Sequence, residues 1–304
     1  MRTVYLGSSA FAVDVLGALA ASPHAPVLVV TPPDRPRGRG RKTGPPPAAV
    51  AARDLGLPVL QAESVNDPAA VAAIADAAPD VVGVCEFGQL IRQPLLSQYT
   101  MLNVHPSLLP RWRGAAPIER ALMAGDSVTG VTIFQLEEGL DSGPVALSRR
   151  EAILPGDTRG TLGERLSALG AALLIEAFDR AEAGALELRP QPQEGVTYAE
   201  KIDPAERRLD PARPASELER IVRALTPGIG AYLELEAGGR LGVDAARVAD
   251  AAVGPGAVVA DDGRLLVGCA EGALELLRVR PAGGRSMPAA DYLRGHRPGS
   301  RLAG

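Results

Sequence analysis

The feature that most constrains the fold is an alternation of short apolar runs with amphipathic segments along the first half of the chain. Residues 3–7 (TVYLG), 26–31 (PVLVVT), 80–86 (DVVGVCE) and 101–105 (MLNVH) have the length and apolar character of buried strands. Helix-like segments such as 10–22 stand between them. Strands that alternate with helices predict an α/β fold with a largely parallel sheet and helices on both faces. Ligands of such sheets bind beyond the carboxyl ends of the strands.

After a long helical segment at 161–184, the alternation of strands and helices ends. Residues 188–204 are polar and contain three prolines, which predicts a linker. Beyond them, one amphipathic segment is followed by short strand-like runs separated by the turns AGG, DDG and AEG. Several short strands with such turns predict a small antiparallel β-barrel. We therefore expect a first domain at 1–187, a linker at 188–204 and a second domain at 205–304.

Composition limits the partners and the compartment. A chain of 304 residues with 46 % hydrophobic side chains is long enough for about two packed domains. Its formal net charge of −4 excludes a wholly basic nucleic-acid-binding protein, so a nucleic acid would be held by local basic segments. Cys85 and Cys269 are too few for a disulfide framework or a cysteine-rich zinc site. With no signal-peptide pattern and no membrane-spanning apolar run, we expect a soluble, cytoplasmic monomer.

Two polar side chains fall at the end of the predicted strand at 101–105. Asn103 and His105 are two residues apart, so they point to the same side of that strand, and Pro106 ends its hydrogen-bonded ladder. An amide can donate to a developing oxyanion, and an imidazole can move a proton near neutral pH. The pattern leaves two interpretations open: an active site, or a histidine satisfied by backbone beside a proline-rich turn.

A carboxylate follows the predicted strand at 128–136. Asp141 lies in the turn EEGLDSG, where Gly139 and Gly143 permit unusual backbone dihedrals. Brought near His105, this carboxylate would orient the ring. Taken alone, the pattern favours an ordinary Asx turn.

Basic residues gather in two places. Residues 35–42 lie in a loop rich in Pro and Gly, and residues 275–304 contain six arginines against two carboxylates. Dense basic charge in a flexible loop favours phosphate or RNA contact, and a solvated loop is the alternative. The five cations of the loop are Arg35, Arg37, Arg39, Arg41 and Lys42.

A further stretch, CEFGQLI at 85–91, closes the predicted strand at 80–86. An aromatic residue followed by Gly and Gln at the carboxyl end of a strand can line a pocket for a flat ligand. Plain packing of the aromatic ring is the alternative.

Together these motifs resemble the 10-formyltetrahydrofolate-dependent formyltransferases. The most specific is NVHPSLLPRWRGAAPIERAL at 103–122, whose RWRGAAPI portion is similar to the members that formylate initiator methionyl-tRNA. Other motifs follow in the family's order: LGSSAFAVDVL, DRPRGRGRK, EFGQLI, GLDSG, TYAEKID, RALTPGIGAY and MPAADYLRG. The resemblance therefore covers essentially the whole chain.

The resemblance implies a Rossmann-like catalytic domain joined to a C-terminal OB-like barrel that binds tRNA. It implies that Asn103, His105 and Asp141 are catalytic and that 10-formyltetrahydrofolate is the formyl donor. No metal is expected, because the sequence has no clustered His and Cys residues. The resemblance also implies that the loop carrying Arg39 reads the acceptor end of initiator tRNA. The residues that it assigns to folate are Ser107, Leu108, Leu109, Pro110, Phe87, Gly88, Gln89 and Leu90. Phe87 stands where the family often has Tyr, so a phenolic hydroxyl has no part there.

The resemblance also carries an expected reaction. The methionine amine attacks the formyl carbon, and Asn103 donates to the developing oxyanion. His105 either takes the proton of the amine or stabilises the oxyanion as imidazolium, and Asp141 orients it. The sequence leaves the roles of Arg111, Trp112 and Arg113 open.

Other formyl-folate enzymes are the nearest alternatives. A sugar-nucleotide N-formyltransferase would use the same donor and the same three catalytic residue types. A glycinamide ribonucleotide formyltransferase would lack the second domain, and a formyl-folate hydrolase would use water as acceptor. The basic loop and basic C-terminal segment favour tRNA over each of these. A non-catalytic RNA-binding protein on the same scaffold is disfavoured because the Asn, His and Asp are all present.

Overall fold

The structure is a computed structural model that describes residues 1–37, 42–236, 239–296 and 298–302. The chain forms two compact units. The first comprises residues 1–117, 128–152 and 163–199, and the second comprises 118–127, 153–162 and 200–304. Within the described ranges, no helix has the length and apolar character needed to cross a membrane.

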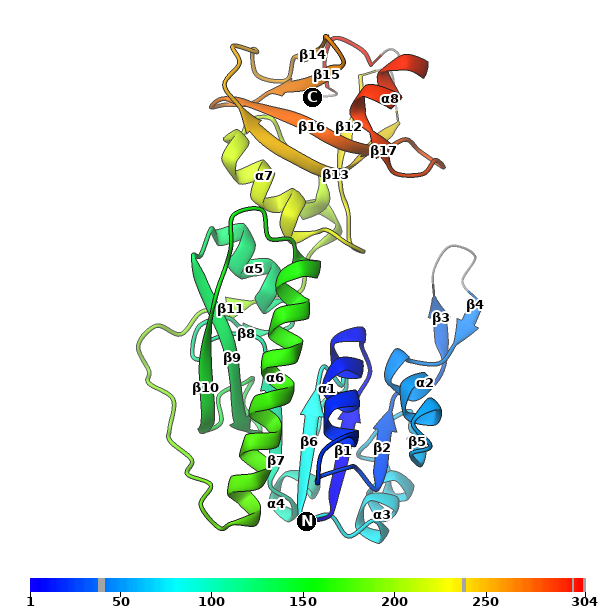
Figure 1. The fold of residues 1–304 in the computed structure, drawn as a ribbon, viewed down its shortest axis with the longest axis vertical. Helices are drawn as coiled ribbons and strands as arrows, with labels where there is room; N and C mark the ends of the chain where they lie inside the picture. The colour runs from blue at the N-terminus through cyan, green and yellow to red at the C-terminus, as the bar shows by residue number, and fades with distance from the viewer. Residues whose placement is uncertain (38–41, 237–238, 297, 303–304) are drawn as a thin grey trace. The chain divides into compact units, whose positions relative to one another are not determined.

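A seven-stranded sheet forms the centre of the first unit (Figure 1). Its order is β10-β9-β7-β6-β1-β2-β5. The five strands from β7 to β5 are parallel, whereas β9 is antiparallel to β7 and β10 is antiparallel to β9. The strands are β1 (Thr3–Gly7), β2 (Leu28–Thr31), β5 (Val59–Gln61), β6 (Val81–Cys85), β7 (Met101–His105), β9 (Val128–Gln135) and β10 (Val145–Ala152).

Helices cover both faces of this sheet, as the alternation of the sequence predicts. Helices α1 (Ala10–Ala20) and α6 (Arg159–Glu182) pack on one face, where the Tyr5 hydroxyl donates to the Ala12 carbonyl at 2.8 Å. Helices α3 (Pro68–Asp76) and α4 (Leu95–Gln98) pack on the other face, with Val4 and Leu6 in their hydrophobic cluster. Successive residues of β1 thus enter two different cores, which is why this strand is buried throughout.

The strand order reverses at β1. Strands β2 and β5 extend the sheet to one side of β1, and β6, β7, β9 and β10 extend it to the other. The carboxyl ends of β1, β6 and β7 therefore lie at the edge where a sheet of this kind binds its ligand.

Shorter elements complete the first unit. Helix α2 (Pro47–Asp54) contacts α1, and the basic loop forms the hairpin β3 (Arg35–Arg37) and β4 (Lys42–Gly44). A two-stranded parallel pair joins β8 (Arg113–Gly114) to β11 (Tyr198–Ala199). This pair connects the segment that follows β7 to a segment that the sequence assigns to the linker.

The second unit is a six-stranded antiparallel sheet of order β12-β13-β16-β15-β14, with β17 paired to β16. Bridges from Leu235 to Leu302 and from Ala257 to Arg301 connect both edges of the sheet to the last described residues. The expected parallel sheet and small antiparallel domain are thus confirmed. The strands are β12 (Ala231–Glu234), β13 (Arg240–Ala249), β14 (Val258–Asp261), β15 (Arg264–Gly268), β16 (Ala273–Arg280) and β17 (Met287–Pro288).

A tight hairpin turn and one amphipathic helix are the features of this unit that the sequence explains best. Asp262 and Gly263 both have positive φ, at 45° and 74°, which is the geometry of a two-residue hairpin between β14 and β15. Helix α7 (Ala215–Ala224) buries Leu218 and Ile221 in the core of the sheet. The remaining helices of this unit are α5 (Pro117–Ala124), the 3-10 helix η1 (Pro204–Arg207) and α8 (Ala289–Gly295). The expected domain boundaries at 187 and 204 stay a prediction.

A buried carboxylate in the second sheet pairs with two partly exposed arginines. Glu275 on β16 is 5 % exposed and accepts from Arg264 at 2.7 Å and from Arg247 at 3.0 Å. Arg264 first, and then Arg247, hold the pKa of this carboxyl below its ordinary value of 4.5.

We expect Glu275→Gln to lower the free energy of unfolding by about 1–3 kcal/mol at pH 7, because two guanidinium groups lose a charged acceptor. The carboxylate stabilises the fold above the ordinary pKa, so the difference from the parent should shrink as the pH falls below 4.5 towards the lower folded value. Urea unfolding from pH 7 to pH 3 measures this. Asp291→Asn, which alters an exposed pair with Arg294, is the control and should change stability little. An equal effect of both substitutions at every pH would contradict the account.

Candidate active site

Asn103 and His105 occupy alternate positions of β7, as their spacing predicts. Asn103 pairs with Val84 on one side and with Phe134 on the other, and His105 pairs with Thr132. The histidine is 4 % exposed, whereas the asparagine is half-buried. Within the described residues, no side-chain hydrogen bond is formed by the Asn103 amide, so both of its polar atoms are available to a ligand.

The His105 ring is held by a backbone carbonyl. Its Nε2 lies 2.8 Å from the Trp112 carbonyl oxygen, and the edge of the ring packs against Phe134 with centroids 6.2 Å apart. A carbonyl only accepts hydrogen bonds, so Nε2 must carry the proton. The lone pair of the neutral ring is therefore on Nδ1.

Asp141 faces that second nitrogen. Its Oδ2 lies 3.7 Å from His105 Nδ1 and accepts a hydrogen bond of 2.7 Å from the Gly114 backbone N–H. The distance to Nδ1 is too long for a direct hydrogen bond. The family resemblance, and not the local pattern, implies that Asp141 lies near His105, and the structure places the two side chains 3.7 Å apart.

The turn that carries Asp141 is backbone-strained and tightly packed. Asp141 has φ of 46°, a left-handed conformation that side-chain-bearing residues rarely adopt. A Cβ at Gly143 would overlap the Gln135 carbonyl oxygen, so a glycine is required there. Strain of this kind is typical of functional turns and persists only when the surroundings hold it in place.

The segment 107–110 forms a compact turn against β9. The buried Ser107 hydroxyl donates to the Arg111 carbonyl at 2.6 Å, and the Leu109 N–H donates to Thr132 Oγ1 at 3.2 Å. Leu108 and Leu109 are half-buried, and the Leu108 side chain lies against Gly130 of β9. Internal hydrogen bonds thus fix the backbone of this turn. Both leucine side chains remain partly exposed.

In the stretch 86–91, some side chains are packed in the core and others are exposed. Phe87 is 3 % exposed and belongs to the hydrophobic cluster beneath the sheet, whereas Leu90 is 63 % exposed. The Gln89 amide accepts from the Val65 N–H at 2.7 Å and donates to the Ala62 carbonyl at 2.8 Å. Gly88 has φ of 79°. In this structure Phe87 and Gln89 hold the loop in place, and Leu90 is the side chain that it presents outwards.

Part of the predicted basic set can be placed. Arg35 is exposed on β3, and β3 pairs with β4 in register Arg35↔Gly44 and Arg37↔Lys42. Arg39 and Arg41 lie outside the described residues. The hairpin was not expected from the Pro- and Gly-rich sequence, which predicts only an irregular loop.

The structure assigns contacts to the three residues whose roles the sequence leaves open. Trp112 has φ of 63° and supplies the carbonyl that holds His105. The Arg111 guanidinium lies over the Trp112 ring at 4.3 Å. Arg113 turns inwards, is 9 % exposed and donates to Gln191. None of these contacts follows from sequence spacing.

Sequence reasoning missed Gln191 and Thr197. Thr197 accepts from the Trp112 N–H through its hydroxyl at 2.9 Å and from the Arg113 N–H through its carbonyl at 2.9 Å. Gln191 contacts both Arg113 and the Asp141 turn. Both residues lie in the proline-rich segment predicted to be a linker, whose polar composition gives no sign of burial.

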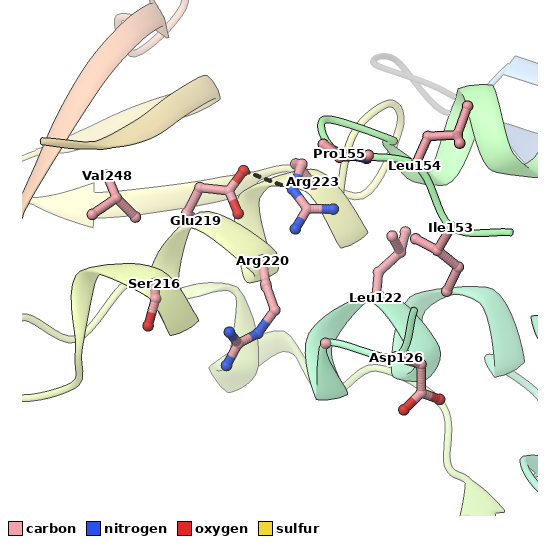
Figure 2. A pocket seen from close by; sticks show the side chains of 11 residues that line it. Leu122, Asp126, Ile153, Leu154, Pro155, Ser216, Glu219, Arg220, Arg223 and Val248 are labelled. Carbon is pink, nitrogen blue, oxygen red and sulfur yellow. Dashed lines mark hydrogen bonds and ion pairs between the residues drawn. The ribbon is translucent and has the colours of Figure 1, made fainter. Parts of the chain in front are cut away.

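A separate cavity of about 300 Å³ lies within the second unit (Figure 2). Leu122 and Asp126 line it from the end of α5 and the turn that follows, and Arg220 and Arg223 line it from α7. Arg223 pairs with Glu219 on the same helix at 2.6 Å, and Arg220 donates to the Met123 carbonyl at 3.1 Å. The cavity contains none of the residues that the sequence predicts for the site.

The chain matches two family models. Residues 1–178 match the formyl transferase family, and residues 201–297 match the formyl transferase C-terminal domain. A methionyl-tRNA formyltransferase of Parvibaculum lavamentivorans is 42 % identical over 310 residues, with both chains fully covered. An enzyme of the same name from Halorhodospira halophila is 46 % identical over 303 residues, covering 97 % of this chain and 96 % of its own.

Solved structures share the fold at low identity. HypX from Aquifex aeolicus in complex with tetrahydrofolic acid has a TM-score of 0.67 and 19 % identity, covering 96 % of this chain and 47 % of its own. An N-formyltransferase from Helicobacter canadensis, complexed with folinic acid and dTDP-3-aminofucose, has a TM-score of 0.61 and 14 % identity. That comparison covers 94 % of this chain and 99 % of the other.

The close approach of Gly114 to Ala199 yields a stability prediction. Gly114 has φ of 121°, and an added Cβ would lie 2.8 Å from the Ala199 carbonyl oxygen. We expect Gly114→Ala to lower the free energy of unfolding by about 3–5 kcal/mol, because the strain and the clash add. Gly195→Ala is the control: its φ is 78° but no atom lies within 4 Å of the added Cβ, so about 1 kcal/mol is expected. Equal losses in urea unfolding would show that the contact with Ala199 is unimportant.

Proposed function

The chain belongs to the formyl transferase family, and we propose that it transfers the formyl group of 10-formyltetrahydrofolate to the amino group of methionine esterified to initiator tRNA. The product would be N-formylmethionyl-tRNA, the substrate of translation initiation. The similarity to methionyl-tRNA formyltransferases over the whole length of the chain supports the choice of acceptor. The observation that carries the chemistry is the arrangement at the end of β7, where Asn103 lies two residues before His105 and Asp141 faces the His105 ring.

The reaction needs one proton taken up and one released. The methionine amine attacks the formyl carbon, a C–N bond forms, and the carbonyl electron pair moves to oxygen. Collapse of this tetrahedral intermediate breaks the bond to N10 of the folate. The amine nitrogen loses a proton and N10 gains one, so the enzyme needs an oxyanion donor and a group that carries a proton.

Asn103 suits the oxyanion. Its side chain is half-buried on the catalytic strand, and the described residues around it leave its amide N–H groups available. A donor that is fixed before the reaction costs no reorganisation when the negative charge develops. We assign this amide to the formyl oxygen.

His105 suits the proton transfer through Nδ1. Because Nε2 donates to the Trp112 carbonyl, Nδ1 is the nitrogen that can accept the proton of the attacking amine. Asp141, 3.7 Å away, would stabilise the resulting imidazolium. Of the two roles that the sequence leaves open for His105, this geometry favours that of the general base. The protonated ring would then return its proton to N10 of the folate.

We infer that the folate would lie against the side chains of Leu108 and Leu109. Both side chains are half-buried in a turn whose backbone is fixed by Thr132, and the exposed Leu90 offers further apolar surface on the neighbouring loop. Rigid apolar walls suit a flat pterin ring. Ser107, Pro110, Phe87, Gly88 and Gln89 would shape this site, chiefly by holding the two loops.

The acceptor stem of the tRNA would contact the basic hairpin. Arg35 is exposed, and Arg37 and Lys42 are register partners at the base of the loop that carries Arg39 and Arg41. Guanidinium groups bind phosphates and can enter a groove where the terminal base pair is weak or absent.

A formyl-transfer assay tests the proposal and the three catalytic assignments together. With 10-formyltetrahydrofolate and initiator methionyl-tRNA, the parent should produce N-formylmethionyl-tRNA, whereas an amino-sugar nucleotide should not be formylated. Asn103→Ala and His105→Ala should each lower kcat by about 10²–10³-fold, because an oxyanion donor or a proton acceptor is lost. Gln98→Ala, at an exposed polar residue of α4 outside every predicted site, is the control. Formylation of the sugar alone would overturn the proposal.

Arg39→Ala tests the reading of the acceptor stem. We expect the preference for initiator over elongator methionyl-tRNA to fall about 10-fold or more, since a bidentate base contact is worth about 1–3 kcal/mol of discrimination. The KM for the folate donor should not change. Arg53→Ala on α2, where Arg53 bonds Gln61, is the control. Equal rates on both tRNAs in the parent, or unchanged selectivity in the variant, would exclude this role.

A further inference from the structure

Gln191 has an unusually complete set of hydrogen bonds for a residue in a proline-rich segment. It is 7 % exposed, and its Oε1 accepts from Arg113 Nε at 3.1 Å and Nη2 at 2.7 Å. Its Nε2 donates to the Asp141 carbonyl and to the Gly143 carbonyl, both at 2.8 Å. All the hydrogen-bonding positions of a side-chain amide are thus used.

These bonds join the two turns that hold the members of the catalytic pair. Arg113 directly follows Trp112, whose carbonyl orients His105. Asp141 and Gly143 form the strained turn whose carboxylate faces the same ring. Gln191 therefore bridges the turn behind the histidine to the turn behind the aspartate.

We propose that Gln191, acting with Arg113, is a positioning residue that sets the separation between His105 Nδ1 and Asp141 Oδ2. The inference rests on the proposed function for its catalytic meaning. Its structural basis is independent, because Gln191 touches neither carboxylate nor imidazole and acts only through the backbone of the Asp141 turn and the Arg113 side chain.

The chemistry of the site requires an amide. A glutamate would keep the acceptor for Arg113 but would place a carboxylate oxygen against two backbone carbonyls. A leucine would leave the buried Arg113 guanidinium without this acceptor and the two carbonyls without their donor. An asparagine is one methylene too short to span the same four atoms. Only Gln both accepts from the guanidinium and donates to the turn.

The surrounding segment supports the same role. The Thr197 N–H donates to the Pro110 carbonyl at 3.3 Å, and Ala199 accepts from the Ala115 and Ala116 N–H groups at 2.8 Å and 3.1 Å. Residues 191–199 thus hold the segment 110–116 at several points. Within residues 191–199, Gln191 is the residue that also bonds to the Asp141 turn.

The experiment compares four variants of the full chain: Gln191→Glu, Gln191→Leu, Arg113→Met/Gln191→Leu, and the control Arg189→Ala. Arg189 lies in the same proline-rich segment, 188–204. Its side chain is exposed and, among the described side chains, bonds only the exposed Glu187. The kinetic readouts are kcat and the KM values for both substrates in formyl transfer. The structural readouts, which need no substrate, are the unfolding free energy and residue-resolved amide hydrogen exchange.

We expect Gln191→Glu and Gln191→Leu to lower kcat by about 10–100-fold with both KM values within about threefold, because a misplacement near 1 Å has this effect on catalysis. The Gly114 amide, which donates to Asp141 Oδ2, should exchange faster, whereas the Ala115 and Ala116 amides should stay protected. The double variant should recover stability relative to Gln191→Leu, since the buried guanidinium is gone, but its kcat should remain low.

Three results would overturn the proposal. The first is parental kcat in Gln191→Glu. The second is a kcat that recovers together with stability in the double variant, which would show a purely structural role. The third is unchanged Gly114 exchange in both single variants. If Gln191→Leu fails to fold, Gln191→Glu still decides, because it retains a partner for Arg113. Failure of the parent to formylate methionyl-tRNA would refute the proposed function and leave the exchange test intact.

Discussion

The Trp112 carbonyl oxygen, 2.8 Å from His105 Nε2, determines which nitrogen of the neutral ring carries the proton. A carbonyl cannot donate, so the proton of the neutral ring lies on Nε2 and the lone pair lies on Nδ1, which faces Asp141. The distance of 3.7 Å between Nδ1 and the carboxylate is too long for a direct hydrogen bond between them. The assignment of His105 as the proton acceptor depends on this one backbone contact.

That contact exists because Trp112 adopts a left-handed backbone conformation, in a turn whose backbone is bonded to the segment 197–199. The Trp112 N–H donates to the Thr197 hydroxyl, the next residue pairs in β8 with β11, and Gly114 approaches the Ala199 backbone closely. A strained residue persists when its surroundings define its conformation more strongly than its own preference does. Segment 191–199 supplies those surroundings, and Gln191 extends them to Asp141.

The sequence predicts much of this arrangement because simple periodicities determine it. The period of two places Asn103 and His105 together, and the alternation of strands and helices places them at a ligand-binding edge. The DDG turn likewise predicts the hairpin between β14 and β15, where Asp262 and Gly263 take the expected positive φ. These signals are local, so a single sequence carries them.

The parts that sequence reasoning missed depend on contacts between distant segments. Gln191 is 78 residues from Arg113 and 50 from Asp141, and a polar glutamine between two prolines looks like an exposed linker residue. The bonds of the Gln89 amide to Ala62 and Val65 likewise join distant segments, whereas its expected contact with folate stays a prediction. Hydrogen bonds of buried side chains have no periodicity by which to recognise them.

The central claim concerns the position of one proton, and NMR of the histidine side chains measures it most directly. The chain contains three histidines, so His24→Ala and His296→Ala variants assign the His105 signals in two-bond ¹H–¹⁵N correlation spectra. We predict that the neutral His105 ring carries its proton on Nε2, with the ¹⁵N shift of Nδ1 typical of an unprotonated nitrogen. A neutral ring protonated on Nδ1 would contradict the account, because the nitrogen that faces Asp141 could then not accept the proton of the amine.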